Sequence, residues 1–215
     1  ENCITMQEDN EGFLYPIVDM SLCIDCGLCE KVCPVINQYK PFVSEPPSFA
    51  CVNNNEEIRM SSSSGGVFTL IAENVIYDKG VVFGARFEKD WSVVHDYTET
   101  IEGLKKFRGS KYVESKIGDN YIKAREFLKQ GRKVLFSGTP CQIAGLNHFL
   151  RKKYENLFCI DLVCHGVPSN KVWNLYVEEI LQSNSIDRKQ YEIIRSITFR
   201  SKREGWRKFG LEVEA

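Results

Sequence analysis

The chain has 215 residues, of which 43% are apolar and 27% charged, and this composition excludes a disordered, collagen-like or coiled-coil protein. Its 28 basic and 29 acidic side chains leave a net charge of -1, so no global field favours nucleic acid or an acidic membrane surface. The nine cysteines accompany neither a signal peptide nor an apolar run long enough to span a bilayer. We therefore expect a cytoplasmic protein whose reduced thiols serve metal or redox chemistry.

Cysteine and proline divide the chain into two parts. Five of the nine cysteines lie within the first 33 residues, and a proline-rich stretch over residues 41–48 follows, where helix and strand are both disfavoured. We expect a small module over residues 1–40, a linker over 41–48 and a larger domain over 49–215. The chain begins at Glu1 and ends in an alternating, strand-like stretch over 211–215, so we expect a fragment truncated at both ends.

The first module contains a motif with regular cysteine spacing. Residues 23–34 read Cys-Ile-Asp-Cys-Gly-Leu-Cys-Glu-Lys-Val-Cys-Pro, which is C-x2-C-x2-C-x3-C-P. Structural zinc, the alternative, usually takes paired ligands from separated turns. The segment resembles bacterial-type ferredoxins, and the predicted metal ligands are Cys23, Cys26, Cys29 and Cys33. In two-cluster ferredoxins the fourth cysteine ligates the other cluster, so the full-length protein is expected to hold one or two 4Fe-4S clusters, with the role of Cys3 left open.

The larger domain begins with segments of mixed type. The pattern predicts, in order, a strand over 49–53, a serine-glycine turn over 61–66, a helix over 67–79, a hairpin of strands over 81–87 and 91–97, and a short helix over 101–107. The serine-glycine turn has two interpretations. It is either a solvated linker or a helix start whose backbone N–H groups suit a phosphate or an electron-rich ring edge.

From residue 110 onward strands and helices alternate. We predict strands over 111–114, 133–137 and 157–163, the last buried on both faces, and helices over 120–130, 141–153 and 169–181. This βαβα pattern favours ligands at the carboxyl ends of the strands, at residues 137–142 and 164–166. The turn Thr139-Pro140 places Cys141 at a helix N-terminus, where the helix dipole favours negative charge. A basic hairpin around Gly205 is expected to be a solvated face rather than an anion or partner contact.

Four segments resemble the beta subunits of coenzyme F420 hydrogenases and dehydrogenases. They are Ser63-Ser64-Gly65-Gly66-Val67-Phe68, Gly109-Ser110-Lys111-Tyr112-Val113, residues 137–146 beginning Ser-Gly-Thr-Pro-Cys-Gln, and residues 161–169 containing Cys164-His165-Gly166. The resemblance implies a flavoprotein that carries FAD beside iron-sulfur clusters. It implies cofactor-binding roles for Ser63, Ser64, Gly65, Gly66, Ser110, Lys111, Gly138, Thr139, Pro140, Cys141 and Gln142, and catalytic roles for Cys141, His165 and Lys111.

The fold expected is α+β or α/β: a small ferredoxin-like iron-sulfur module followed by a mixed-sheet α/β flavin-binding domain with a βαβα second half. We predict an oxidoreductase that passes electrons between 4Fe-4S clusters and a flavin, and that reduces or oxidises an organic acceptor such as a deazaflavin. Its expected partners are a redox protein or ferredoxin and a small organic acceptor, with no nucleic acid and no membrane span; an oligomer remains open. The alternatives are a cluster-only electron-transfer or scaffold subunit, and a thiol redox protein using Cys141 with Cys164 as resolving partner.

Several residues are predicted to be structural. His95 and His148 are expected at the surface, and Cys51 and Cys159 are expected to pack as small hydrophobes. The aromatic side chains of Phe68, Trp173 and Tyr176 are expected to lie on helical core faces.

Overall fold

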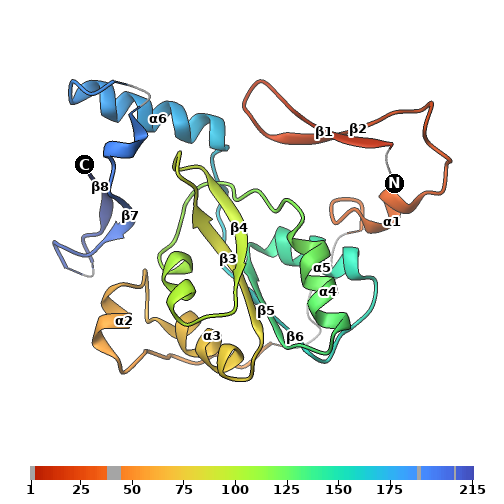
Figure 1. Ribbon diagram of the computed structural model, residues 1–215, viewed down its shortest axis with the longest axis horizontal. Helices are drawn as coiled ribbons and strands as arrows, with labels where there is room; N and C mark the ends of the chain where they lie inside the picture. Colours follow the sequence, from red (N-terminus) through yellow and green to blue (C-terminus); the bar gives the residue numbers. More distant parts are fainter. Residues whose placement is uncertain (1–2, 38–44, 188–189, 206) are drawn as a thin grey trace.

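The computed structural model describes residues 3–37, 45–187, 190–205 and 207–215. At its centre lies a four-stranded sheet of order β4-β3-β5-β6 (Figure 1). Its strands are β3 (Val81–Phe87), β4 (Val93–Thr98), β5 (Val134–Gly138) and β6 (Leu157–Asp161). Strand β3 pairs antiparallel with β4 and parallel with β5, and β5 pairs parallel with β6. The predicted mixed sheet is therefore confirmed.

Helices cover both faces of this sheet. The helices α3 (Val67–Tyr77) and η1 (Glu102–Phe107) pack on one face, and α4 (Asn120–Lys129) and α5 (Pro140–Leu150) pack on the other. Alternation along β5 explains the division, because Val134 and Phe136 join the core cluster beneath α4 and α5 while Leu135 joins the cluster beneath α3. The result is a three-layer arrangement, and the predicted α/β class is confirmed.

The carboxyl-terminal part forms a separate layer beside β4. Helix α6 (Asn170–Ser183), the short η2 (Tyr191–Ile193) and the antiparallel pair β7 (Ser196–Ser201) and β8 (Gly210–Glu214) share a core that contains Trp173. The indole of Trp173 donates to the backbone oxygen of Trp91 at 2.8 Å, and its ring packs on Phe199 with centroids 5.0 Å apart. The predicted hairpin around Gly205 is therefore present and tied to the sheet through α6.

The amino-terminal module contains β1 (Ile4–Glu8), β2 (Leu14–Val18) and α1 (Leu28–Val32), and α2 (Glu56–Met60) follows it in the chain. The β1-β2 hairpin extends away from the central sheet (Figure 1). Its tip is held at the start of α6, where the Ser169 hydroxyl donates to the Glu11 carbonyl and Lys171 Nζ donates to the Asn10 carbonyl at 3.0 Å. Helix α1 packs against α5. The module thus contacts the larger domain through its hairpin and through α1.

Some local predictions are wrong. Residues 49–53 and 111–114 contain no strand; the second segment is a loop because Val113 turns into the core beside α6 and Glu114 bonds to Pro168. Strand β6 is at the sheet edge and mostly exposed, not buried on both faces. The residues predicted to pack inside but found exposed are Cys51, Cys159 and Tyr176. Conversely, His95 is buried.

Candidate functional site

Two of the predicted site segments lie at the carboxyl ends of β5 and β6, which are neighbouring parallel strands. Gly138 of β5 is in register with Asp161 of β6, and the backbone N–H of Leu162 donates to the Gly138 carbonyl at 2.9 Å. Residues 139–142 start α5 beyond the first strand, and the loop with Cys164 and His165 leaves the second. Both segments are therefore at adjacent strand ends, where open α/β sheets commonly bind ligands.

The turn at residues 139–142 has the geometry of a capped helix start. Thr139 is the N-cap in extended conformation, Pro140 occupies the first helical position and Cys141 is exposed in the first turn. The Thr139 hydroxyl lies 3.0 Å from Cys141 Sγ. Because the first N–H groups of a helix lack intrahelical acceptors, this turn presents partial positive charge at the exposed position of Cys141.

The side chain of Gln142 holds this turn in place. Its Oε1 accepts from the Thr139 N–H at 3.0 Å, and its Nε2 donates to the Ser115 carbonyl at 3.1 Å and to the Ser115 hydroxyl at 2.9 Å. The Gln142 carbonyl accepts from the Tyr121 hydroxyl at 2.7 Å. Both ends of the amide are thus engaged within the chain, so its geometry supports a role in holding the turn rather than direct contact with a flavin ring.

The serine-glycine turn at residues 61–66 is a built loop. The N–H of Asn53 donates to the Gly65 carbonyl at 2.7 Å, and the Asn53 amide contacts the Gly66 carbonyl at 3.4 Å. Gly66 has φ 77 and is the N-cap of α3, which explains a glycine there. The Ser63 hydroxyl accepts from the N–H of Ser110 at 2.6 Å. Two of the predicted cofactor segments, around Ser63 and around Ser110, are therefore in contact.

Lys111 follows Ser110 in the same loop. Its Nζ donates to the carbonyls of Lys106, Arg108 and Gly109 at 3.0, 3.0 and 3.1 Å. Burial lowers the pKa of Lys111 to about 7, while the three carbonyl oxygens favour its charged form. The ammonium group therefore also serves to shape the loop that carries Ser110.

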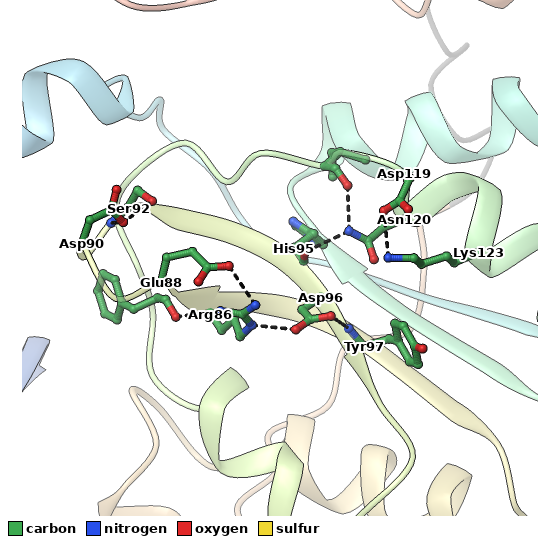
Figure 2. A network of polar contacts seen from close by, with 12 residues as sticks. Arg86, Glu88, Asp90, Ser92, His95, Asp96, Tyr97, Asp119, Asn120 and Lys123 are labelled. Carbon is green, nitrogen blue, oxygen red and sulfur yellow. Dashed lines mark hydrogen bonds and ion pairs between the residues drawn. The ribbon is translucent and has the colours of Figure 1, made fainter.

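Polar side chains of β3 and β4, on the side of the sheet away from β6, are paired with one another (Figure 2). Arg86 donates to Asp96 at 2.7 Å and to Glu88 at 2.9 Å, and these contacts raise its pKa. Asn120, at the start of α4, donates to the His95 carbonyl at 2.8 Å. These contacts fix β4, which carries His95, relative to α4.

The cysteine motif forms a tight loop that leads into α1. Asp25 and Gly27 have φ 53 and 63, and Cys29 lies within the helix. Cys26 and Cys29 are exposed, and Cys23 and Cys33 are half-buried. In the described part of the chain no three Cys, His, Asp or Glu side chains gather as they would around a metal ion, so the four thiols lie along the loop without converging. Four thiolate donors within eleven residues nevertheless fit a cuboidal cluster in type and spacing.

Two segments of the chain match known protein families. Residues 131–214 match the family described as the carboxyl terminus of the coenzyme F420 hydrogenase/dehydrogenase beta subunit, and residues 16–35 match a 4Fe-4S binding domain. The carboxyl-terminal two fifths of the chain are therefore similar to this beta-subunit family. The match includes the Thr139–Gln142 turn and the Cys164-His165 loop, whereas the serine-glycine turn and Lys111 lie outside it.

A solved structure has the same fold. A chain of the F420-reducing [NiFe] hydrogenase complex from Methanosarcina barkeri, in a study of xenon derivatization, aligns with a TM-score of 0.51 at 16% identity. The alignment covers 76% of this chain and 58% of that chain. None of the curated proteins matches. Among the described residues, every helix is too short or too polar to cross a membrane.

Sequence reasoning missed the residues that hold the site together. His95, Ser115 and Asn53 bond to the candidate turns, yet none lies in a recognisable motif. The signal for Asn53 is weak, because an asparagine in a short apolar run also suits an ordinary turn.

Proposed function

We propose that this protein is an iron-sulfur flavoprotein in which electrons pass between a 4Fe-4S cluster held by the cysteine motif and FAD bound at the Thr139–Gln142 turn. The single observation that carries the proposal is the packing of α1 against α5. Helix α1 carries Cys29, and α5 begins at the candidate flavin turn. The two predicted redox sites therefore belong to helices in direct contact, which favours electron exchange within one chain.

The residues of this chain have distinct parts in the proposal. Cys23, Cys26, Cys29 and Cys33 supply thiolates, with Cys33 serving a second cluster where the full-length protein holds one. The N–H groups at the start of α5 favour an electron-rich ring edge beside Cys141. Ser63, which contacts Ser110, and Ser64 would bind another part of the cofactor. When bound, a flavin exchanges single electrons with clusters and electron pairs with an organic acceptor.

The family and the structural likeness favour an acceptor of the deazaflavin type. The likeness comes from an F420-reducing complex, and the present chain spans 58% of the matched chain. We therefore include four further points in the proposal. They are activity with F420, the identity of the donor, assembly with redox partner proteins and a cytoplasmic location. His165 is exposed after β6, and its contact with an acceptor at this strand edge is part of the proposal.

The experiment is an anaerobic purification with flavin, iron and sulfide analysis of three variants. Cys26→Ser is expected to lose most of the cluster iron and keep flavin. Cys141→Trp, which adds bulk at an exposed position beside the turn, is expected to lose flavin and keep iron. Leu175→Trp is the control, because it adds bulk at an exposed position of α6 outside the predicted turns, and it is expected to keep both. Wild-type protein with full iron and sulfide but no flavin would contradict the proposal and favour the cluster-only alternative.

A further inference from the structure

His95 is a buried histidine whose ring contacts the strand and the loop next to the candidate flavin turn. It lies on β4 with 4% of its surface exposed, and its ring stacks on Phe136 with centroids 5.4 Å apart. Its Nε2 is 2.9 Å from the Ser137 carbonyl, and its Nδ1 is 2.9 Å from the Ser115 hydroxyl. Both ring nitrogens are therefore engaged, one by the strand that leads into the turn and one by the loop beside it.

The acceptors around this ring set the direction of every hydrogen bond. A carbonyl oxygen only accepts, so Nε2 carries the proton and donates to Ser137. Burial lowers the pKa of His95 and keeps the ring neutral, which leaves Nδ1 as an acceptor for the Ser115 hydroxyl. The Ser115 oxygen then accepts from Gln142 Nε2, and Gln142 Oε1 accepts from the Thr139 N–H.

We propose that His95 is a positioning residue for the cofactor: through Ser115 and Gln142 it orients the first backbone N–H groups of α5 toward the flavin. The chain of bonds links Ser137, at the end of β5, to Thr139, at the start of α5, through side chains alone. This inference rests on the proposed flavin site at the turn.

The bonds explain why a neutral imidazole is suited to this position. Without its acceptor on His95, the Ser115 hydroxyl is free to rotate and to donate toward Gln142. The Gln142 amide would then face a donor at the Ser115 hydroxyl, and its Nε2 would keep only the bond to the Ser115 carbonyl. The bond from Gln142 to Thr139 would be held less firmly, because a buried polar network with one member unsatisfied loses stability.

The test uses three variants and a control. His95→Phe keeps a planar ring but removes both polar atoms, Ser115→Ala removes the middle hydroxyl, and His95→Gln retains one donor and one acceptor. His148→Phe, on α5 but outside these bonds, is the control. Amide hydrogen exchange of residues 139–142 is measured on flavin-free protein, and the flavin dissociation constant and midpoint potential are measured on reconstituted protein.

The expected result is local. His95→Phe and Ser115→Ala should each speed exchange at residues 139–142 and weaken flavin binding by about ten-fold, the effect of one buried hydrogen bond. His95→Gln should restore most of both, and exchange in β3 and β5 should be unchanged. Unaltered exchange at the turn, or faster exchange throughout the sheet without rescue by His95→Gln, would overturn the inference. Because exchange is read without flavin, a protein that binds no flavin would refute the proposed function and still decide the role of His95.

Discussion

Gly65 is expected to be intolerant of even one added methyl group. A Cβ at this position would lie 2.7 Å from the carbonyl oxygen of Cys51 and 3.4 Å from the Cα of Val52. The Gly65 carbonyl also accepts from the Asn53 N–H at 2.7 Å, so the methyl group would push apart two segments that this bond holds together. Gly65→Ala should cost about 2 kcal/mol, roughly half from the hydrogen bond and half from overpacking.

Thermal unfolding measures this loss, which corresponds to a Tm about 4–8 °C lower for a domain of this size. Gly210→Ala is the matched control, because φ lies outside the left-handed region at both glycines and no atom lies within 4 Å of a Cβ added at Gly210. That control should change stability by less than about 0.5 kcal/mol. A Gly65→Ala variant as stable as the control would show that the turn accommodates the methyl group freely. It also follows that Gly65→Val should reduce flavin retention by distorting the turn, whether or not its side chain reaches the cofactor.

Three further predictions concern the core and the turn. Burial holds the pKa of His95 below its ordinary 6.5, so on acidification the unfolded chain binds a proton at this histidine before the folded protein does. The contribution of His95 to the free energy of unfolding is therefore complete above pH 6.5 and falls as the pH drops below 6.5. Urea unfolding at several pH values should show that His95→Gln removes this pH dependence. Leu146→Ala should cost about 2–5 kcal/mol in the same assay because its side chain is fully buried between α5 and the sheet, and a cost near zero would mean that α5 is not docked. Cys141→Ser should retain flavin and iron, with only a modest change in flavin potential and in turnover with a viologen donor. Turnover lower by orders of magnitude would indicate that the Cys141 thiol is essential, and loss of iron would indicate that Cys141 is a cluster ligand.

Elements with a clear hydrophobic period are predictable from the sequence. The spacing of Ile143, Leu146 and Leu150 predicts helix α5, and Leu146 and Leu150 are buried in the core beneath it. The apolar run of β5 and the proline at the start of α5 likewise place the Thr139–Gln142 turn at a strand end. Such features are local, so a window of a few residues contains the whole signal.

Features that depend on distant partners are not predictable in this way. His95 stands alone in its strand, and its bond partner Ser115 is 20 residues away, with Gln142 a further 27 residues on. The apolar run of β6 predicts a fully buried strand, yet it forms an exposed edge because no further strand of the described chain pairs beyond it. Neither outcome is encoded in local periodicity, since burial is decided by which elements pack together.

Electron transfer from the cluster to the flavin is tested most directly by the rate of flavin reduction after mixing the anaerobic, full-length protein with a reduced one-electron viologen donor. Rapid reduction is expected in the wild-type protein, and reduction slower by orders of magnitude is expected in Cys26→Ser protein that still contains its flavin. Equal rates in the two proteins would show that electrons reach the flavin without the cluster, contrary to the proposed function.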